Sequence, residues 1–202
     1  GEFATIISRL SKESNLKPIY PSKEFSDVSS RDFYFEDLKY VTSLGYLQGY
    51  PDGSFKGEEK ITIAEFAATI SRIIDNKNLE VKDDVWYRDY IDFMNKYWLY
   101  DIYNSSTDYN SVIKREEMVH IFNKLIGIKP DRDFIDENIS GMRTFTDVSK
   151  SNPYYYDIIA SGNTFTFSDN WTDYLNISTL RWRIDSYKDA KSPQSFKFYI
   201  NR

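Results

Sequence analysis

Few side chains in this sequence have the type and spacing that metal binding requires. The chain has a single histidine, His120, and no cysteine, so a zinc site is not expected and His120 should pack or face solvent. The carboxylate-rich stretch DRDFIDEN, residues 131–138, resembles a calcium loop superficially. It lacks the glycine and the final glutamate that an EF-hand loop needs. We therefore predict no metal ion and no cofactor.

Catalytic motifs do not occur either. The sequence has no Gly-x-Ser-x-Gly, no glycine-rich phosphate loop and no His-Glu-x-x-His. Its 31 acidic residues offer many carboxylate pairs for glycoside hydrolysis, but nothing distinguishes one pair from another. We predict that the protein is not an enzyme.

The residues best suited to contact a ligand are three aromatic residues and those of one turn. Phe33, Trp86 and Tyr154 stand at the heads of expected helices, where a ring either packs in the core or stacks on a sugar. A tight turn is strongly favoured at Pro51, Asp52 and Gly53, because proline restricts φ and glycine tolerates positive φ. A structural turn explains these residues, and contact of Asp52 and Gly53 with a sugar is the alternative.

The composition argues against two classes of partner. A net charge of −5 without a basic cluster does not suit nucleic acid. No apolar run is long enough to cross a membrane, which needs about 18 residues or more. The aromatic fraction of 17% favours a surface that binds sugars or proteins.

A repeat of about 50 residues organises the chain. EFATIISRL in residues 2–10 nearly duplicates EFAATISRII in residues 65–74, and EEMVHIFNKLIGI is a weaker copy in residues 116–128. FSDVSSRDFYFEDLKYVTSLG in residues 25–45 is echoed by FTDVSKSNPYYYDIIASGN in residues 145–163. Each unit therefore predicts an aromatic-headed helix, a loop and a second helix, and several units must share one core.

The second helix of the first unit has the clearest signals. Thr62 is a good N-cap, and Glu65 completes a capping box. An apolar stripe follows at helical spacing: Phe66, Ile70, Ile73 and Ile74. In the third unit we expect the second helix to start after Ser178. The alternating tail after Pro193 predicts an edge strand, with a frayed end as the alternative.

The first unit is similar to the S-layer homology repeat, because it contains the motifs of that repeat in the same order: Phe-x-Asp-Val, the aromatic-headed helix, GYLQGYPDGSF and ITIAEFA. The second unit keeps Trp86, Tyr87, Ile91 and IKREEM but lacks the Gly-Tyr-x-Asp-Gly loop. The third keeps FTDV and YYYDII. The resemblance covers roughly residues 25–190, and its quality falls toward the C-terminus.

The resemblance implies binding of secondary cell-wall polysaccharide, often capped by pyruvylated sugars, in grooves between adjacent repeats. In the family pattern an arginine near the start of the second helix binds the acidic sugar, where a guanidinium fork and the helix N-terminus both favour an anion. That arginine is Arg115 in unit two, and Ile63 stands at the matching position in unit one. In unit three Thr179 stands at the matching position, with Arg181 close by on the same expected helix. An ion pair with a neighbouring glutamate is the alternative for Arg115.

The resemblance also implies a mainly α fold, with three tandem helix-loop-helix repeats in a pseudo-threefold helical cluster. We expect an additional N-terminal helix, either the trailing helix of a preceding unit or an unrelated element. The predicted segments are the N-terminal helix 2–14, repeat one 20–77, repeat two 80–128, a polar linker 129–144, a diverged repeat three 145–190 and a tail 191–202.

The function implied is a non-catalytic module that anchors an exported or S-layer protein to the bacterial cell surface. Its expected partner is cell-wall polysaccharide, and its expected location is extracellular. The alternative is a diverged scaffold for protein–protein assembly in a surface layer, because Ile63 replaces one arginine and the third unit departs furthest from the pattern.

Overall fold

The computed structural model describes residues 1–13, 15–75, 85–97, 99–125, 129–163, 180–183 and 197–200. The described part is mainly helical, as predicted. Its helices are α1 (Glu2–Glu13), α2 (Phe35–Ser43), α3 (Ile63–Asp75), α4 (Arg88–Lys96), α5 (Arg115–Leu125), α6 (Arg132–Asn138), a 3-10 turn (Ile139–Gly141) and α7 (Tyr155–Gly162). Two short antiparallel strands, β1 (Leu180–Arg183) and β2 (Lys197–Ile200), form a separate ribbon.

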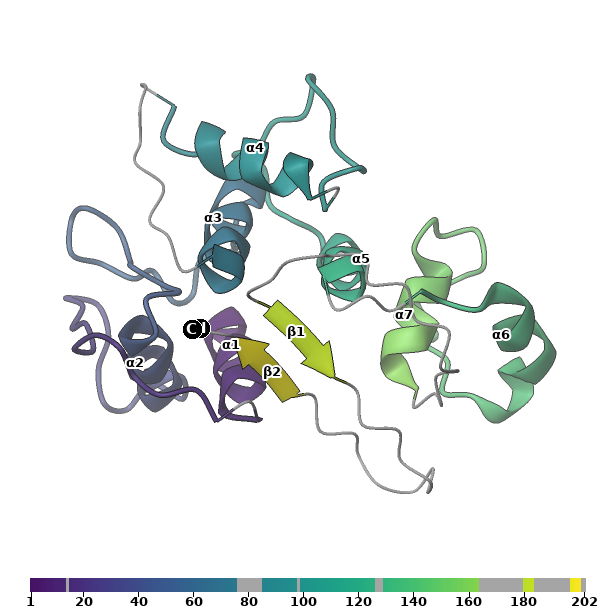
Figure 1. Cartoon of the computed structure of the whole chain (residues 1–202), viewed down its shortest axis with the longest axis horizontal. Coiled ribbons are helices and arrows are strands. Elements are labelled where there is room, and N and C mark those ends of the chain that lie inside the picture. The colour runs from purple at the N-terminus through teal and green to yellow at the C-terminus, as the bar shows by residue number, and fades with distance from the viewer. Residues whose placement is uncertain are drawn as a thin grey trace.

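The helices pack as three neighbouring pairs. α1 packs against α2, α3 against α4, and α5 against α7. Figure 1 shows α2, α4 and α7 on the outside, around α1, α3 and α5. We call α1, α3 and α5 the inner helices, α2, α4 and α7 the outer helices, and each pair a junction. Each junction joins an inner helix to the outer helix that follows it in the chain, so consecutive units interlock.

Phe66 connects the three inner helices. Its side chain on α3 is fully buried, and its ring centroid lies 5.6 Å from that of Phe3 on α1 and 5.6 Å from that of Phe122 on α5. The apolar stripe predicted for α3 is buried with it, at Ile70, Ile73 and Ile74. Ala4 and Ile7 of α1 belong to the same core, so the N-terminal helix is an integral part of this domain.

The start of α3 is held as the capping box predicts. The Thr62 N–H donates to Glu65 Oε2 at 2.8 Å, and the Glu65 N–H donates to Thr62 Oγ1 at 3.2 Å. Glu65 also accepts from the Tyr50 hydroxyl. The chain before α5 pairs with this start, because the Ile63 N–H donates to the Ser111 carbonyl at 3.0 Å. The first residues of α3 and the approach to α5 are thereby fixed together.

Two predictions for the C-terminal part are wrong. The helix expected after Ser178 is not formed at Leu180–Arg183, which is strand β1. Arg181 therefore lies on a strand, opposite Tyr199 of β2 in the ladder, and not on a helix. The edge strand expected in the tail is confirmed as β2, which lies against α1.

The polar segment 129–144, predicted as a linker, contains α6. Asp131 caps this helix by accepting from the Phe134 N–H at 3.0 Å. Ile135 is buried and forms a second small core with Tyr155 and Ile159 of α7. Ile135 is the buried residue of α6, and the Tyr156 hydroxyl of α7 also donates to Asp136 Oδ2 at 3.0 Å. Because most other residues of α6 are charged, its sequence did not indicate a packed helix.

Within the described residues, none of the helices combines the length and apolarity needed to cross a membrane.

Phe66→Ala should destabilise the domain by about 3–5 kcal/mol, because it leaves a cavity where the three inner helices meet. Phe66→Leu should cost less, since it keeps most of the buried volume. Urea unfolding followed by circular dichroism measures both. Equal and small losses would show that the inner helices do not depend on this contact.

Candidate functional site

Phe33 and Trp86 occupy equivalent exposed positions. Each lies two residues before an outer helix, and the rings are 69% and 41% exposed. Phe33 meets Tyr34 edge-on, with centroids 5.1 Å apart and planes at 89°. Trp86 meets Tyr87 in the same way, at 5.6 Å and 88°. The ring that packs inward is the following tyrosine, so the core interpretation does not hold for Phe33 and Trp86.

Tyr154 is not equivalent to Phe33 and Trp86. It directly precedes α7, just as Tyr34 precedes α2 and Tyr87 precedes α4. Pro153 therefore occupies the exposed position in the third unit. Tyr154 is half-buried, and its ring lies 5.3 Å from that of His120 on α5. The prediction that Tyr154 has the place of Phe33 and Trp86 is therefore wrong by one residue, because three tyrosines follow one another at residues 154–156.

Arg115 is the first residue of α5, and its side chain is 91% exposed. Its Nη2 atom lies 3.5 Å from Oε2 of Glu2 on α1, whose side chain is also mostly exposed. An ion pair this long and this exposed contributes little to stability. The guanidinium therefore remains available to an anionic ligand at the N-terminus of α5.

Ile63 is the first residue of α3, the position that Arg115 has on α5. Only 4% of Ile63 is exposed. Its carbonyl accepts from the Tyr100 hydroxyl at 2.9 Å, and Tyr100 is itself fully buried. The start of α3 is thus closed by apolar packing where α5 presents a cation.

The side chain of Asp52 forms hydrogen bonds within its own turn. Asp52 Oδ1 accepts from the Ser54 N–H at 2.9 Å and from the Ser54 hydroxyl at 2.6 Å. The bond from the Ser54 hydroxyl is the main reason that the pKa of Asp52 is lowered. Gly53 has a φ of +82°, which favours glycine. These contacts support the turn interpretation, while contact with a sugar stays a prediction.

Asp27 is a structural residue that the site prediction missed. Its carboxylate accepts from the Phe55 N–H and from the Lys56 N–H, each at 2.7 Å. Desolvation raises the pKa of Asp27, but these two amides outweigh it and the net pKa is lowered. The aspartate of the Phe-x-Asp-Val motif therefore holds the loop after α2, and the motif itself was the available signal.

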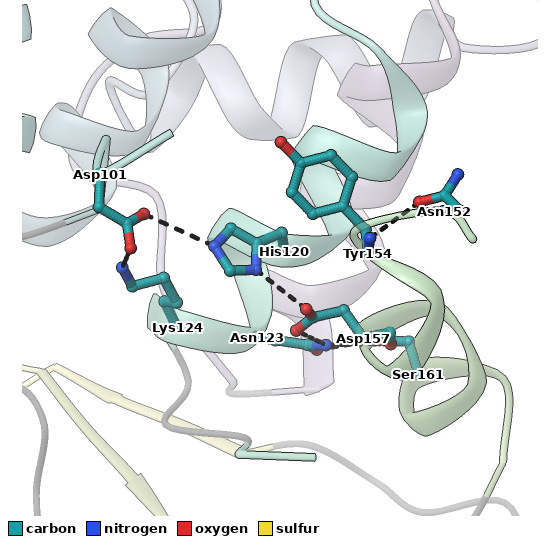
Figure 2. A network of polar contacts seen from close by, with 8 residues as sticks. All are labelled: Asp101, His120, Asn123, Lys124, Asn152, Tyr154, Asp157 and Ser161. Atoms are coloured by element: carbon teal, nitrogen blue, oxygen red, sulfur yellow. Dashed lines mark hydrogen bonds and ion pairs between the residues drawn. The ribbon is translucent and has the colours of Figure 1, made fainter. Parts of the chain in front are cut away.

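A polar network at the α5–α7 junction was also missed (Figure 2). Asp157 on α7 lies between two α5 side chains: His120 Nδ1 is 3.0 Å from Asp157 Oδ2, and Asn123 Nδ2 donates to Asp157 Oδ1 at 3.0 Å. The Ser161 hydroxyl donates to Asn123 Oδ1 at 2.9 Å. Closer to the N-terminus of α5, Asn152 Nδ2 donates to Glu116 Oε2 at 3.0 Å. His120 is therefore a junction residue.

No group of three or more His, Cys, Asp or Glu side chains suited to a metal ion is found in the described ranges.

Comparison with known proteins finds a family similar to part of the chain. Residues 24–67 match the model of the S-layer homology domain. The predicted resemblance is confirmed there, and the number of repeats stays a prediction.

Two curated relatives are each similar to part of the chain. Cell surface glycoprotein 1 of Acetivibrio thermocellus is 28% identical over 125 residues, which are 58% of this chain and 5% of that protein. An uncharacterized protein of Nostoc sp. is 38% identical over 56 residues, which are 27% of this chain and 10% of that protein. The chain thus spans a small part of each relative. No solved structure matches it.

Asp27→Ala should destabilise the domain by about 1 kcal/mol, because the Phe55 and Lys56 amides lose their common acceptor. The folded pKa of Asp27 is lowered, so this stabilisation is present above the unfolded pKa of about 3.9 and lost as the pH falls through the folded value. Thermal unfolding of both proteins from neutral to acidic pH measures the difference.

Asp147→Ala is the matched control, because Asp147 has the same place in the third unit, which lacks the Gly-Tyr-Pro-Asp-Gly loop. An equal loss in both variants, or a difference from wild type that persists at the lowest pH, would contradict the assigned role.

Proposed function

We propose that this domain is a non-catalytic module that attaches a bacterial surface protein to cell-wall polysaccharide. The S-layer homology match of residues 24–67 supports a role at the cell surface, as does the similarity to a cell surface glycoprotein. In this proposal the domain works outside the cell and binds an acidic glycan.

The observation that carries the proposal is the contrast between the starts of α5 and α3. Arg115 is almost fully exposed and only loosely paired, whereas Ile63 is buried at the matching position. A guanidinium can form two parallel hydrogen bonds with a carboxylate such as a pyruvyl group. The helix N-terminus adds a favourable partial charge. We therefore assign the acidic sugar to the N-terminus of α5, where Arg115 faces Glu2 of α1.

Aromatic stacking would act at the α1–α2 and α3–α4 junctions. Phe33 heads the α1–α2 junction and Trp86 heads the α3–α4 junction, and each ring is held edge-on against a tyrosine. A ring fixed in this way loses little rotamer freedom when a sugar stacks on its open face. Arg181, on β1, has no part in this assignment, because it lies outside the helix on which it was predicted.

Arg115→Ala should weaken binding to purified acidic wall polysaccharide by about tenfold at low salt, the value of one charged hydrogen-bonded contact. The difference from wild type should shrink at high salt, because salt screens an exposed cation. Isothermal titration calorimetry at two salt concentrations measures this. Arg9→Ala removes another exposed arginine, on α1, and should bind as wild type does.

Trp86→Ala should weaken binding by about threefold to tenfold, in line with the value of an aromatic contact. This loss should not depend on salt, since stacking on a sugar face involves no net charge. The same titrations with the polymer before and after removal of its acidic groups separate the two contributions. Removal should abolish the effect of Arg115→Ala and leave that of Trp86→Ala.

Unchanged binding by folded Arg115→Ala would refute the assignment of the anion site. Absence of binding by the wild-type domain, together with self-association in sedimentation experiments, would favour the alternative of protein–protein assembly in a surface layer.

A further inference from the structure

The α1–α2 and α5–α7 junctions use an equivalent carboxylate with different partners. Asp37 is the third residue of α2 and Asp157 the third residue of α7. Asp37 accepts from Lys12 Nζ at 2.7 Å and from the Ser8 hydroxyl at 2.6 Å. Asp157 instead faces His120. One junction thus contains a permanent cation, and the other contains the only histidine of the chain.

His120 lies between carboxylates from two directions. Its Nδ1 atom is 3.0 Å from Asp157 Oδ2 on α7, and its Nε2 atom is 3.5 Å from Asp101 Oδ1 in the segment after α4. A neutral imidazole carries a proton on one of its two nitrogens, whereas the imidazolium can donate toward both carboxylates at once. The protonated form therefore links α5, α7 and the segment after α4 (Figure 2).

The other charged and titratable groups around His120 leave the protonated imidazole favoured over the neutral one. Lys124 Nζ binds Asp101 Oδ2 at 2.6 Å and partly offsets that carboxylate. Tyr154 lies against the imidazole ring, and burial raises its pKa, so it stays neutral near pH 7. Asn123 donates to Asp157 but is neutral and does not balance its charge. His120 Nε2 is buried and makes no hydrogen bond in the described structure, so its contact with Asp101 at 3.5 Å is an ion pair only.

We infer that the α5–α7 junction is a pH-sensitive joint, in which protonated His120 holds the third unit to the second and its deprotonation loosens that hold. The hydrogen bond to Asp157 raises the pKa of His120 against the opposing effect of burial. The stabilisation is therefore fully present below the unfolded pKa of about 6.5 and is lost as the pH rises through the higher folded value. The α1–α2 junction, built on Lys12, should not respond in this range.

Hydrogen exchange on the intact chain tests the joint. Between about pH 5.5 and about pH 8, protection factors of α7 amides should fall, on the order of tenfold for each unit by which the folded pKa exceeds the unfolded one. Protection of α2 amides should stay constant. His120→Gln should abolish the pH dependence at α7, whereas Lys12→Gln should lower α2 protection equally at both pH values.

Because His120 is the single histidine of the chain, its ring resonance gives a second readout. Its ring resonance in wild-type protein should titrate above about 6.5, and Asp157→Asn should bring the midpoint down. A midpoint at or below that of a free histidine would overturn the inference. So would constant α7 protection across the range, or a pH response that persists in His120→Gln.

Discussion

The contact of Phe66 with Phe3 and Phe122 is the constraint on which the rest of the structure depends. It joins α1, α3 and α5 at one point, although these helices are far apart in the chain. Aromatic side chains bury the largest apolar areas, so a ring shared by three helices stabilises all three together. Once the inner helices are fixed, each outer helix packs against the exposed side of one inner helix.

The elements with local signals were predictable from the sequence. The capping box of α3 needs only Thr62 and Glu65, and its apolar stripe follows from periodicity within one helix. The helix expected after Ser178 is wrong at the described residues Leu180–Arg183, because the place of such a helix depends on a distant partner. α1 resembles α3 in sequence and packs on α2 as α3 packs on α4. Because α1 already packs on α2, another helix of the same kind at the C-terminal end would find that side of α2 occupied.

The candidate site was predictable in residue type and less so in placement. Phe33 and Tyr34 are adjacent aromatics, and composition alone does not decide which is buried. The helix begins at Phe35, and this sets Tyr34 inward at 3% exposure and Phe33 outward. The pairing of His120 with Asp157 spans 37 residues, so no local pattern could reveal it. The exposure of Arg115 and the burial of Ile63 likewise follow from tertiary packing.

The three junctions keep one apolar frame and differ in polar chemistry. The third residue of the outer helix is Asp37 in α2, Tyr90 in α4 and Asp157 in α7. Tyr90 accepts from Arg72 Nη2 at 3.0 Å, so the α3–α4 junction replaces an ion pair with a hydrogen bond to a phenol. Core positions resist change because a cavity or an overpacked side chain costs several kcal/mol. Polar flanks tolerate exchange as long as each buried group finds a partner. A repeated apolar frame whose polar residues vary independently can therefore carry an exposed guanidinium at the start of α5, an exposed indole before α4 and a titratable imidazole between α5 and α7.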